Sequence, residues 1–337
     1  MATRRRILSG SFDQIGLKYA PANFGLGTED VMNGTILLNK KYIPSTYETK
    51  ESVSVDFKMK YSIHNKKHIL SFRKPVVFVH GGPGIPHHYL KPILDKIKDR
   101  SVIFYDQIGC GDSSEPSDIN AYSIDLAVDD LQRLIEHLNL LQFHLVGHSY
   151  GGIIAFEYVK RCASMRESIS TVSASYRCLS ITLCSTPFNV REVDRESERI
   201  LNDIQEDVSE TDAISFFHKT FLCRTDKIPC ALEEAYLLRG KIWQGTEVIK
   251  DYIANSEYVL SHLPPFLLLR GEFDFVSESQ SIGNWKNLVE QSGISEPCKT
   301  FVFPDCSHYI MLEDTGSFSN VLVKFLKEVE GKFGTIA

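Results

Sequence analysis

Three polar residues in separate segments of the chain have the types and the order that acyl transfer requires. Ser149 lies in the stretch LVGHSYGG, between two glycines and after a short apolar run. Asp274 follows a later apolar run, and His308 follows the last one. A serine hydroxyl needs a neighbouring imidazole to take its proton, and the imidazole needs a carboxylate to hold its tautomer. The chain order of serine, acid and histidine fits a nucleophile on a strand-to-helix turn.

The G-x-S-x-G pattern around Ser149 is weak evidence by itself, because such a short pattern arises easily by chance. Its context is more specific: the apolar run FHLV ends at Gly147, and GGIIAFEYVK continues with a helical pattern. A sharp turn between strand and helix brings backbone close together, so we expect Gly147 and Gly151 to be required for steric reasons. This context disfavours the alternative, an ordinary strand-to-helix turn.

A second glycine-rich motif, HGGPG at residues 80–84, directly follows another apolar run. Such a turn can aim backbone N–H groups at a developing negative charge. We expect the N–H groups of Gly82 and Tyr150 to stabilise the tetrahedral intermediate. Taken alone, the motif also fits a simple glycine turn. It is not a phosphate loop, because the G-K-[ST] ending is missing.

Other acids and histidines compete for the two remaining roles. Glu272 precedes the expected loop apex at Asp274, and Asp305 adjoins the histidine itself, so both are weaker candidates than Asp274. Several histidines come too early in the chain and are expected to pack or to hydrogen-bond structurally; they are His80, His87, His88 and His148.

The elements that would position these residues alternate along the chain. Short continuous apolar runs are typical of strands buried on both faces of a parallel sheet; they are PVVFVH, SVIFYD, FHLVGH, LSITLC, PFLLLR and KTFVFP. Apolar residues at helical spacing lie between most of them and after the last, including residues 124–138 and 318–329. The segment SVSVDFKMKYSIHN alternates like a half-exposed antiparallel strand. The fold class is therefore α/β, with a mostly parallel central sheet and helices on both faces.

One region breaks this alternation. Residues 189–262 carry four charged helical patterns and no strong strand, which predicts a helical cap inserted over the carboxyl edge of the sheet. The expected organisation is an irregular N-terminal extension at 1–50, a core at 51–188, the cap at 189–262 and the rest of the core at 263–337. Residues 162–176 are expected to form a mobile surface loop.

Composition excludes several functional classes. The net charge of −6 gives no reason to expect a nucleic-acid or membrane partner, and no apolar run approaches membrane-spanning length. The eight cysteines form no C-x-x-C motif and no zinc-ligand spacing, and no signal peptide is evident. We therefore expect free thiols, no metal and a cytoplasmic protein. We also expect no cofactor, and a monomer is the favoured oligomeric state.

Together these motifs resemble the α/β-hydrolase superfamily and, within it, the proline iminopeptidase family of serine peptidases, which includes the archaeal tricorn-interacting aminopeptidase. The matching pieces are HGGPG with HHYL after it, YDQIGCGDS, GHSYGG, GEFD and DCSHYIMLED, spread over residues 75–315. The resemblance implies an α/β-hydrolase fold with an inserted helical cap. The set is far more specific than any one motif.

The resemblance also implies how the substrate is held. The family binds the substrate's α-ammonium through acidic residues in and beside the cap, and IWQGTEV is similar to one such segment, which gives that role to Glu247. A second glutamate, after the catalytic aspartate in the tricorn-interacting enzyme, is Phe275 here, so one anionic anchor is missing. Glu233 and Glu234 are possible substitutes. Trp243 and Phe275 are candidates for an apolar pocket for the first side chain, with core packing as the alternative.

The sequence thus predicts a cofactor-free serine hydrolase, most simply an aminopeptidase that releases an N-terminal residue, proline or a small or apolar one, from short peptides. An esterase or amidase acting on a small non-peptide substrate would use the same triad. A small-molecule receptor derived from a hydrolase, with negligible turnover, is the alternative of another class. Ser149 argues against epoxide hydrolases and haloalkane dehalogenases, which share the fold but use an aspartate at this turn.

Overall fold

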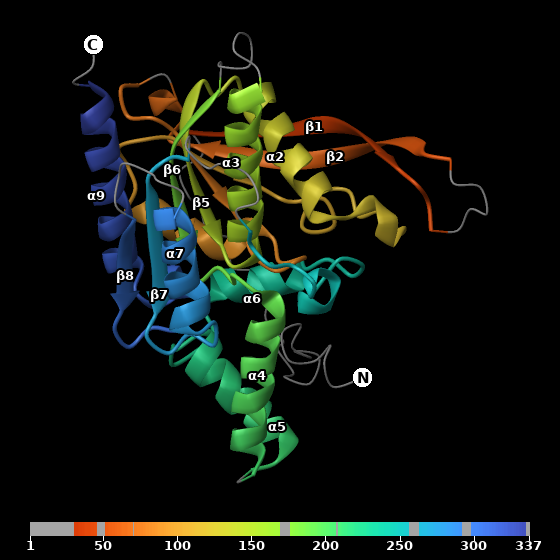
Figure 1. The fold of residues 1–337 in the computed structure, drawn as a ribbon, viewed down its shortest axis with the longest axis vertical. Helices are drawn as coiled ribbons and strands as arrows, with labels where there is room; N and C mark the ends of the chain where they lie inside the picture. The colour runs from red at the N-terminus through yellow and green to blue at the C-terminus, as the bar shows by residue number, and fades with distance from the viewer. Residues whose placement is uncertain are drawn as a thin grey trace.

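An eight-stranded sheet forms the centre of the computed structural model, which describes residues 30–45, 51–69, 71–168, 176–206, 208–255, 263–291 and 298–334 (Figure 1). Its spatial order is β1-β2-β4-β3-β5-β6-β7-β8, antiparallel at β1, β2 and β4 and parallel from there on. The predicted fold class is confirmed. The strands are β1 (Val31–Tyr42), β2 (Val53–His64), β3 (Val76–Val79), β4 (Val102–Tyr105), β5 (Gln142–His148), β6 (Arg177–Cys184), β7 (Phe266–Gly271) and β8 (Lys299–Phe303).

Helical elements cover both faces of the sheet, and alternate residues of each apolar strand point to opposite faces. In β3, Val77 and Val79 belong to one apolar cluster with α2 (Ile124–His137), α3 (Tyr150–Ser168) and α7 (Asn284–Gln291). Val76 and Phe78 belong to the other, with the 3₁₀ segment η4 (His87–Asp95), α9 (Thr315–Gly334) and the helices between β6 and β7. The continuous apolar runs in the sequence therefore reflect burial on two sides.

The two edge strands differ from the sequence prediction. Residues 31–42, expected to be irregular, form β1, so that expectation is wrong for them; residues 1–29 lie outside the described part. Ile36, Leu38 and Lys40 face inward at alternate positions, but Leu37, 68% exposed between them, hides the alternation in the sequence. In β8 the first four residues are exposed, because the strand is at the sheet edge.

The segment between β6 and β7 is helical. It contains α4 (Val190–Gln205), α5 (Glu210–Phe217), the π-helical turn η6 (His218–Leu222), α6 (Cys230–Leu237) and the 3₁₀ turn η7 (Thr246–Ile249). Figure 1 shows α4 and α5 projecting beyond the end of the sheet toward which the arrow of β8 points. Three of the four predicted helices are present. The fourth is wrong in the described part, where it is reduced to η7 followed by a β-bridge from Ile253 to Asn189.

The predicted loop at 162–176 is also wrong for its first half, because α3 continues to Ser168; residues 169–175 lie outside the described part. The remaining short helices are η3 (Lys66–His68), η5 (Ile119–Ala121), η8 (Ser279–Gly283) and α8 (Ile310–Glu313). Within the described residues, no helix combines the length and the apolarity needed to cross a membrane.

Candidate active site

Ser149 lies on a sharp turn between β5, which ends at His148, and α3, which begins at Tyr150. Its φ of 52° is in the left-handed region, which non-glycine residues rarely occupy. The predicted steric role of the flanking glycines is confirmed. A Cβ at Gly147 would lie 2.5 Å from the Gly151 carbonyl oxygen, and one at Gly151 would lie 2.0 Å from that of Val79.

His308 and Asp274 lie in neighbouring loops, after β8 and β7, and contact each other. His308 Nδ1 is 2.9 Å from Asp274 Oδ1, which also accepts a hydrogen bond from the Val276 N–H at 2.9 Å. The histidine is 4% exposed and the aspartate 6%. Nδ1 therefore faces the carboxylate, and the other ring nitrogen, Nε2, is left to exchange a proton with a reacting group.

The rival acids have another task. Glu272 Oε2 accepts a hydrogen bond from the Asp305 N–H at 3.1 Å, which ties the loop after β7 to the loop after β8. Neither carboxylate is paired with a histidine in the described part of the chain.

Glu313 holds the loop that carries His308. Its carboxylate accepts hydrogen bonds from the Ser307 N–H at 2.6 Å and from the Tyr309 N–H at 3.0 Å, on either side of the histidine. Burial raises the pKa of Glu313, against the lowering effect of these N–H donors. Sequence reasoning assigned no role to Glu313, although it belongs to the motif DCSHYIMLED.

A hydrogen-bond chain links the glycine-rich loop to the backbone of His308. The Gly81 N–H donates to the Tyr89 hydroxyl at 2.6 Å, which lies 2.9 Å from His148 Nδ1. His148 Nε2 lies 3.0 Å from the His308 carbonyl oxygen. Burial lowers the pKa of His148 well below its usual value, with help from the charge of His308, so the ring is neutral. We therefore assign the tautomer in which Nε2–H donates to the carbonyl and Nδ1 accepts from Tyr89.

The loop HGGPG lies against the serine. A Cβ placed on Gly81 would be 3.1 Å from the Ser149 Cβ, and Gly82 has a φ of 118°. In the described part of the chain, the N–H groups of Gly82 and Tyr150 donate no hydrogen bond to protein. Both are available to an oxyanion, and their assignment to that role stays a prediction.

The three residues proposed to contact substrate lie in different surroundings. Phe275 packs on the His308 ring, with centroids 4.5 Å apart, and is 4% exposed. Trp243 stacks on Tyr122 at 5.7 Å, with nearly parallel rings. Glu247 is half-exposed on η7, where Lys250 Nζ pairs with its carboxylate at 2.7 Å. Only Phe275 contacts a member of the predicted triad directly.

Comparison with known proteins places this geometry in a family. Residues 74–315 match the model of the α/β hydrolase fold. A proline iminopeptidase from Heyndrickxia coagulans is 33% identical over 281 residues, which cover 76% of this chain and 91% of that one. The chain belongs to the proline iminopeptidase family. A second member, from Saccharolobus solfataricus, is 26% identical over 75% of this chain and 85% of its own length.

Solved structures extend the likeness of fold beyond proline iminopeptidases. The proline iminopeptidase of Mycobacterium smegmatis superposes with a TM-score of 0.65 at 19% identity, covering 87% of this chain and 99% of that one. A thermophilic esterase from Thermogutta terrifontis gives 0.57 at 18% identity, with the same coverage. The protein is thus a serine hydrolase of α/β fold, and the fold by itself does not select peptide over ester.

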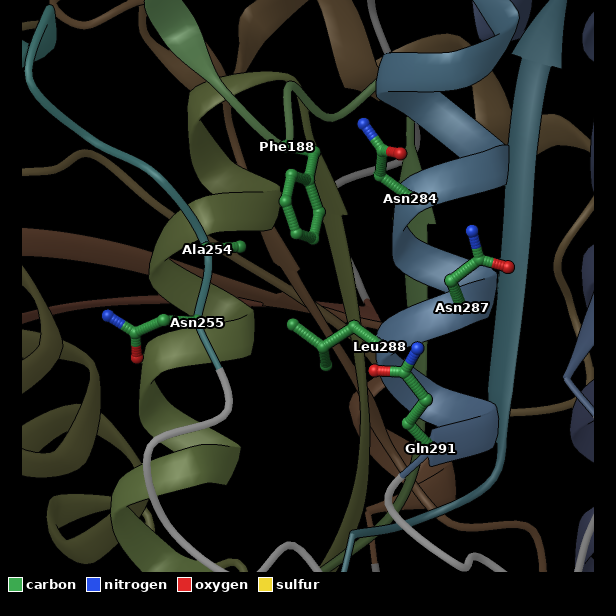
Figure 2. A pocket seen from close by; sticks show the side chains of 7 residues that line it. All are labelled: Phe188, Ala254, Asn255, Asn284, Asn287, Leu288 and Gln291. Atoms are coloured by element: carbon green, nitrogen blue, oxygen red, sulfur yellow. The ribbon is translucent and has the colours of Figure 1, made fainter.

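Two cavities differ in their relation to the glycine-rich loop. One is lined by the glycine-rich loop from Gly82 to Ile85 together with Tyr236, Arg239, Gln244 and Gly245 from the predicted cap segment, residues 189–262. Sequence reasoning did not single out Arg239, because an arginine beside a glycine carries no motif. The second is a wider cleft between α7 and the segment before Asn255 (Figure 2). None of the triad residues lines either cavity, but the cleft also lacks any residue of the glycine-rich loop, and we assign it no part in the chemistry.

Proposed function

We propose that this protein is a serine aminopeptidase that releases an N-terminal residue, proline or a small or apolar one, from short peptides. The observation that carries the proposal is the buried His308–Asp274 pair, which lies at the carboxyl ends of the parallel strands. Ser149 occupies its left-handed turn at the carboxyl end of β5 in the same sheet. The relatives named proline iminopeptidase supply the reaction class. Cofactor and metal have no step in this chemistry.

In the proposed reaction, His308 Nε2 takes the proton of the Ser149 hydroxyl as its oxygen attacks the scissile carbonyl carbon. The Gly82 and Tyr150 N–H groups stabilise the resulting oxyanion. The C–N bond then breaks, His308 returns the proton to the leaving amine, and an acyl-enzyme remains. Water, deprotonated by His308, attacks the ester carbonyl; the bond from the acyl carbon to the Ser149 oxygen then breaks, His308 returns the proton to that oxygen, and the N-terminal residue leaves as a free acid. Asp274 stabilises the imidazolium in both halves.

Selection of a free N-terminus is assigned to the cap. Glu247 is the proposed partner of the substrate's α-ammonium, and binding would exchange the Lys250 ammonium for that of the substrate. Phe275, on the His308 ring, and Trp243 are proposed to border the first side chain. The helices between residues 189 and 262, as a cap, would exclude long or folded chains.

An esterase or amidase is the second candidate, and one observation favours it. Phe275 stands where the tricorn-interacting enzyme has an anionic anchor, and its ring covers the imidazole of His308 with an apolar surface. Such a surface suits an uncharged acyl group as well as a proline ring. A receptor with negligible turnover would retain the same geometry, so activity has to be measured.

A release assay with paired substrates separates the candidates. The substrates are prolyl- and alanyl-naphthylamide, their N-acetylated forms and a short-chain nitrophenyl ester, with Ser149→Ala as the control for contaminating activity. The proposal expects cleavage of the free-amine amides only. Turnover of the ester alone would establish the esterase instead, and no turnover of any substrate would favour the receptor.

A further inference from the structure

The cavity beside the glycine-rich loop carries a charge that the proposed aminopeptidase reaction does not use. Its lining joins the loop with the predicted oxyanion donor Gly82 to the cap residues Tyr236, Arg239 and Gln244. Among the described residues that line this cavity, Arg239 alone is charged. A guanidinium in the wall of this cavity acts on any ionised group of a substrate that enters it.

Arg239 is held in place by the backbone on both sides. The Gly240 N–H donates to the Gly84 carbonyl oxygen at 2.7 Å, and the Leu238 carbonyl accepts from the Gly111 N–H at 2.9 Å. The Arg239 N–H itself donates to the Tyr236 carbonyl at 3.3 Å. The cap segment is therefore attached to two loops of the core at the residues that flank the arginine. Its position relative to the glycine-rich loop is set by backbone hydrogen bonds.

The same cavity wall contacts the residue after the predicted general base, His308. The Tyr236 hydroxyl is buried, and its oxygen is 3.5 Å from that of Tyr309, the residue after His308. The wall of the cavity thus contacts the loop that carries the proton acceptor, and His308 itself does not line the cavity. Gly82, one of the two predicted oxyanion donors, lines this space, which makes it a place for the part of the substrate next to the scissile carbonyl.

The sign of the charge decides which end of a peptide fits. A substrate ammonium beside Arg239 would be repelled, so the N-terminal residue has to lie on the other side of the scissile bond. A carboxylate matches the planar fork of the guanidinium, and the Gln244 amide is a further hydrogen-bond donor on the same wall. Consecutive Cα atoms are about 3.8 Å apart, so the terminal carboxylate of a dipeptide or tripeptide is within one or two residues of the reacting carbonyl.

We propose that this cavity is a subsite for the free C-terminal carboxylate of the leaving peptide, with Arg239 as its cationic partner. The inference rests on the proposed aminopeptidase function and narrows it. The enzyme then acts on dipeptides and tripeptides with free termini at both ends, and an amide or a long chain in place of that carboxylate loses the contact with Arg239.

The test compares prolyl-alanine with prolyl-alanine amide, with prolyl-naphthylamide as the reference substrate. The expected kcat/KM ratio of free acid to amide is about tenfold or more for the native enzyme. In Arg239→Gln the ratio falls to about one, and Arg239→Lys keeps part of it. Lys241→Gln removes a neighbouring exposed cation and is expected to leave the ratio unchanged. Circular dichroism shows whether each variant is folded.

The outcomes separate the two proposals. Equal cleavage of acid and amide by the native enzyme, or an unchanged ratio in Arg239→Gln, overturns the carboxylate subsite and leaves the aminopeptidase standing. An equal loss of the ratio in Lys241→Gln also overturns the subsite, because general charge would then explain the preference. Failure to cleave all three substrates overturns the aminopeptidase function, and the subsite with it.

Discussion

The loops at the carboxyl edge of the sheet and the helices of the cap segment are held together in different ways. In the loops, His308 is hydrogen-bonded to Asp274, and the N–H groups on either side of it are bound by Glu313, all among buried or half-buried groups. In the cap, helix α4 carries surface ion pairs such as Arg199 with Glu196. The first arrangement restrains His308 by hydrogen bonds to its ring and to the backbone on both sides, whereas the second joins only exposed side chains.

This difference predicts that substitutions in the loops and in the cap have different effects. Exposed ion pairs contribute roughly 0–1 kcal/mol each to stability, so the cap surface tolerates change. A buried polar network that loses one member leaves other groups unpaired, at a cost of about 1–3 kcal/mol for each. We therefore expect changes in the loops to affect every substrate, and changes in the cap to affect only selected substrates.

The largest expected effect is in the loops. Asp274→Asn should keep the shape of the side chain but remove the charge that holds His308 in its tautomer. We expect kcat to fall about 10⁴-fold, for amides and esters alike. Steady-state kinetics on both substrate types checks this, and a loss confined to amides would contradict the assignment.

The pH dependence of the free energy of unfolding tests whether His80, in the glycine-rich loop, is buried and neutral. Burial lowers the pKa of His80 to about 4, although the charge of Asp106 and a hydrogen bond to Gly81 oppose this. The unfolded chain therefore binds a proton that the folded chain does not between about pH 6.5 and 4. The contribution, about 3 kcal/mol in order of magnitude, is fully present above pH 6.5 and is lost as the pH falls toward 4.

Urea denaturation between pH 5 and 7.5 measures this slope. In His80→Gln, an amide takes the place of the ring, which accepts from the Gln107 N–H at 3.0 Å. The free energy of unfolding should then depend on pH less steeply, by up to ~1.4 kcal/mol per pH unit. Identical slopes in the native protein and the variant would show that His80 is not a buried neutral histidine.

Tyr89→Phe should have an intermediate effect. It removes the hydroxyl that joins the Gly81 N–H to His148, and so loosens the loop with the predicted oxyanion donor relative to His308. We expect a loss of about 1–3 kcal/mol in stability and a fall of roughly tenfold in kcat. Tyr252→Phe removes a hydroxyl bonded to Glu157 at 3.0 Å and is the matched control. The Tyr89 role is wrong if both variants change kcat equally.

The smallest expected effect belongs to the cap. Glu247→Gln should raise KM for free-amine amides by roughly three- to tenfold, because one exposed charge contact is lost, and should leave ester hydrolysis unaffected. Glu196→Gln on α4, which breaks an ion pair with Arg199, is the control. An unchanged KM for the free-amine amides would remove Glu247 from substrate binding.

Much of this arrangement could be predicted from the sequence, because it depends on local pattern. The strands after which Asp274 and His308 lie are continuous apolar runs, and Gly147 and Gly151 mark the turn at Ser149. Strand β1 was not predicted, because the exposed Leu37 interrupts the alternation of apolar and polar residues along it.

Contacts between distant segments could not be predicted. Tyr89 and His148 are 59 residues apart, and only the folded chain brings them together. Arg239 reaches its cavity because Gly240 is bonded to a loop more than 150 residues earlier in the chain. Neither residue type nor spacing records such a contact, since it depends on how the cap is placed against the core.

The most direct test of the account is covalent labelling with a fluorophosphonate probe, followed by mass spectrometry of the peptides. The central claim is that the loops at the sheet edge activate Ser149. The account predicts a single adduct on Ser149 in the native protein and little labelling in His308→Gln at the same probe concentration. An adduct on another serine, or labelling of Ser149 that does not depend on His308, would contradict it.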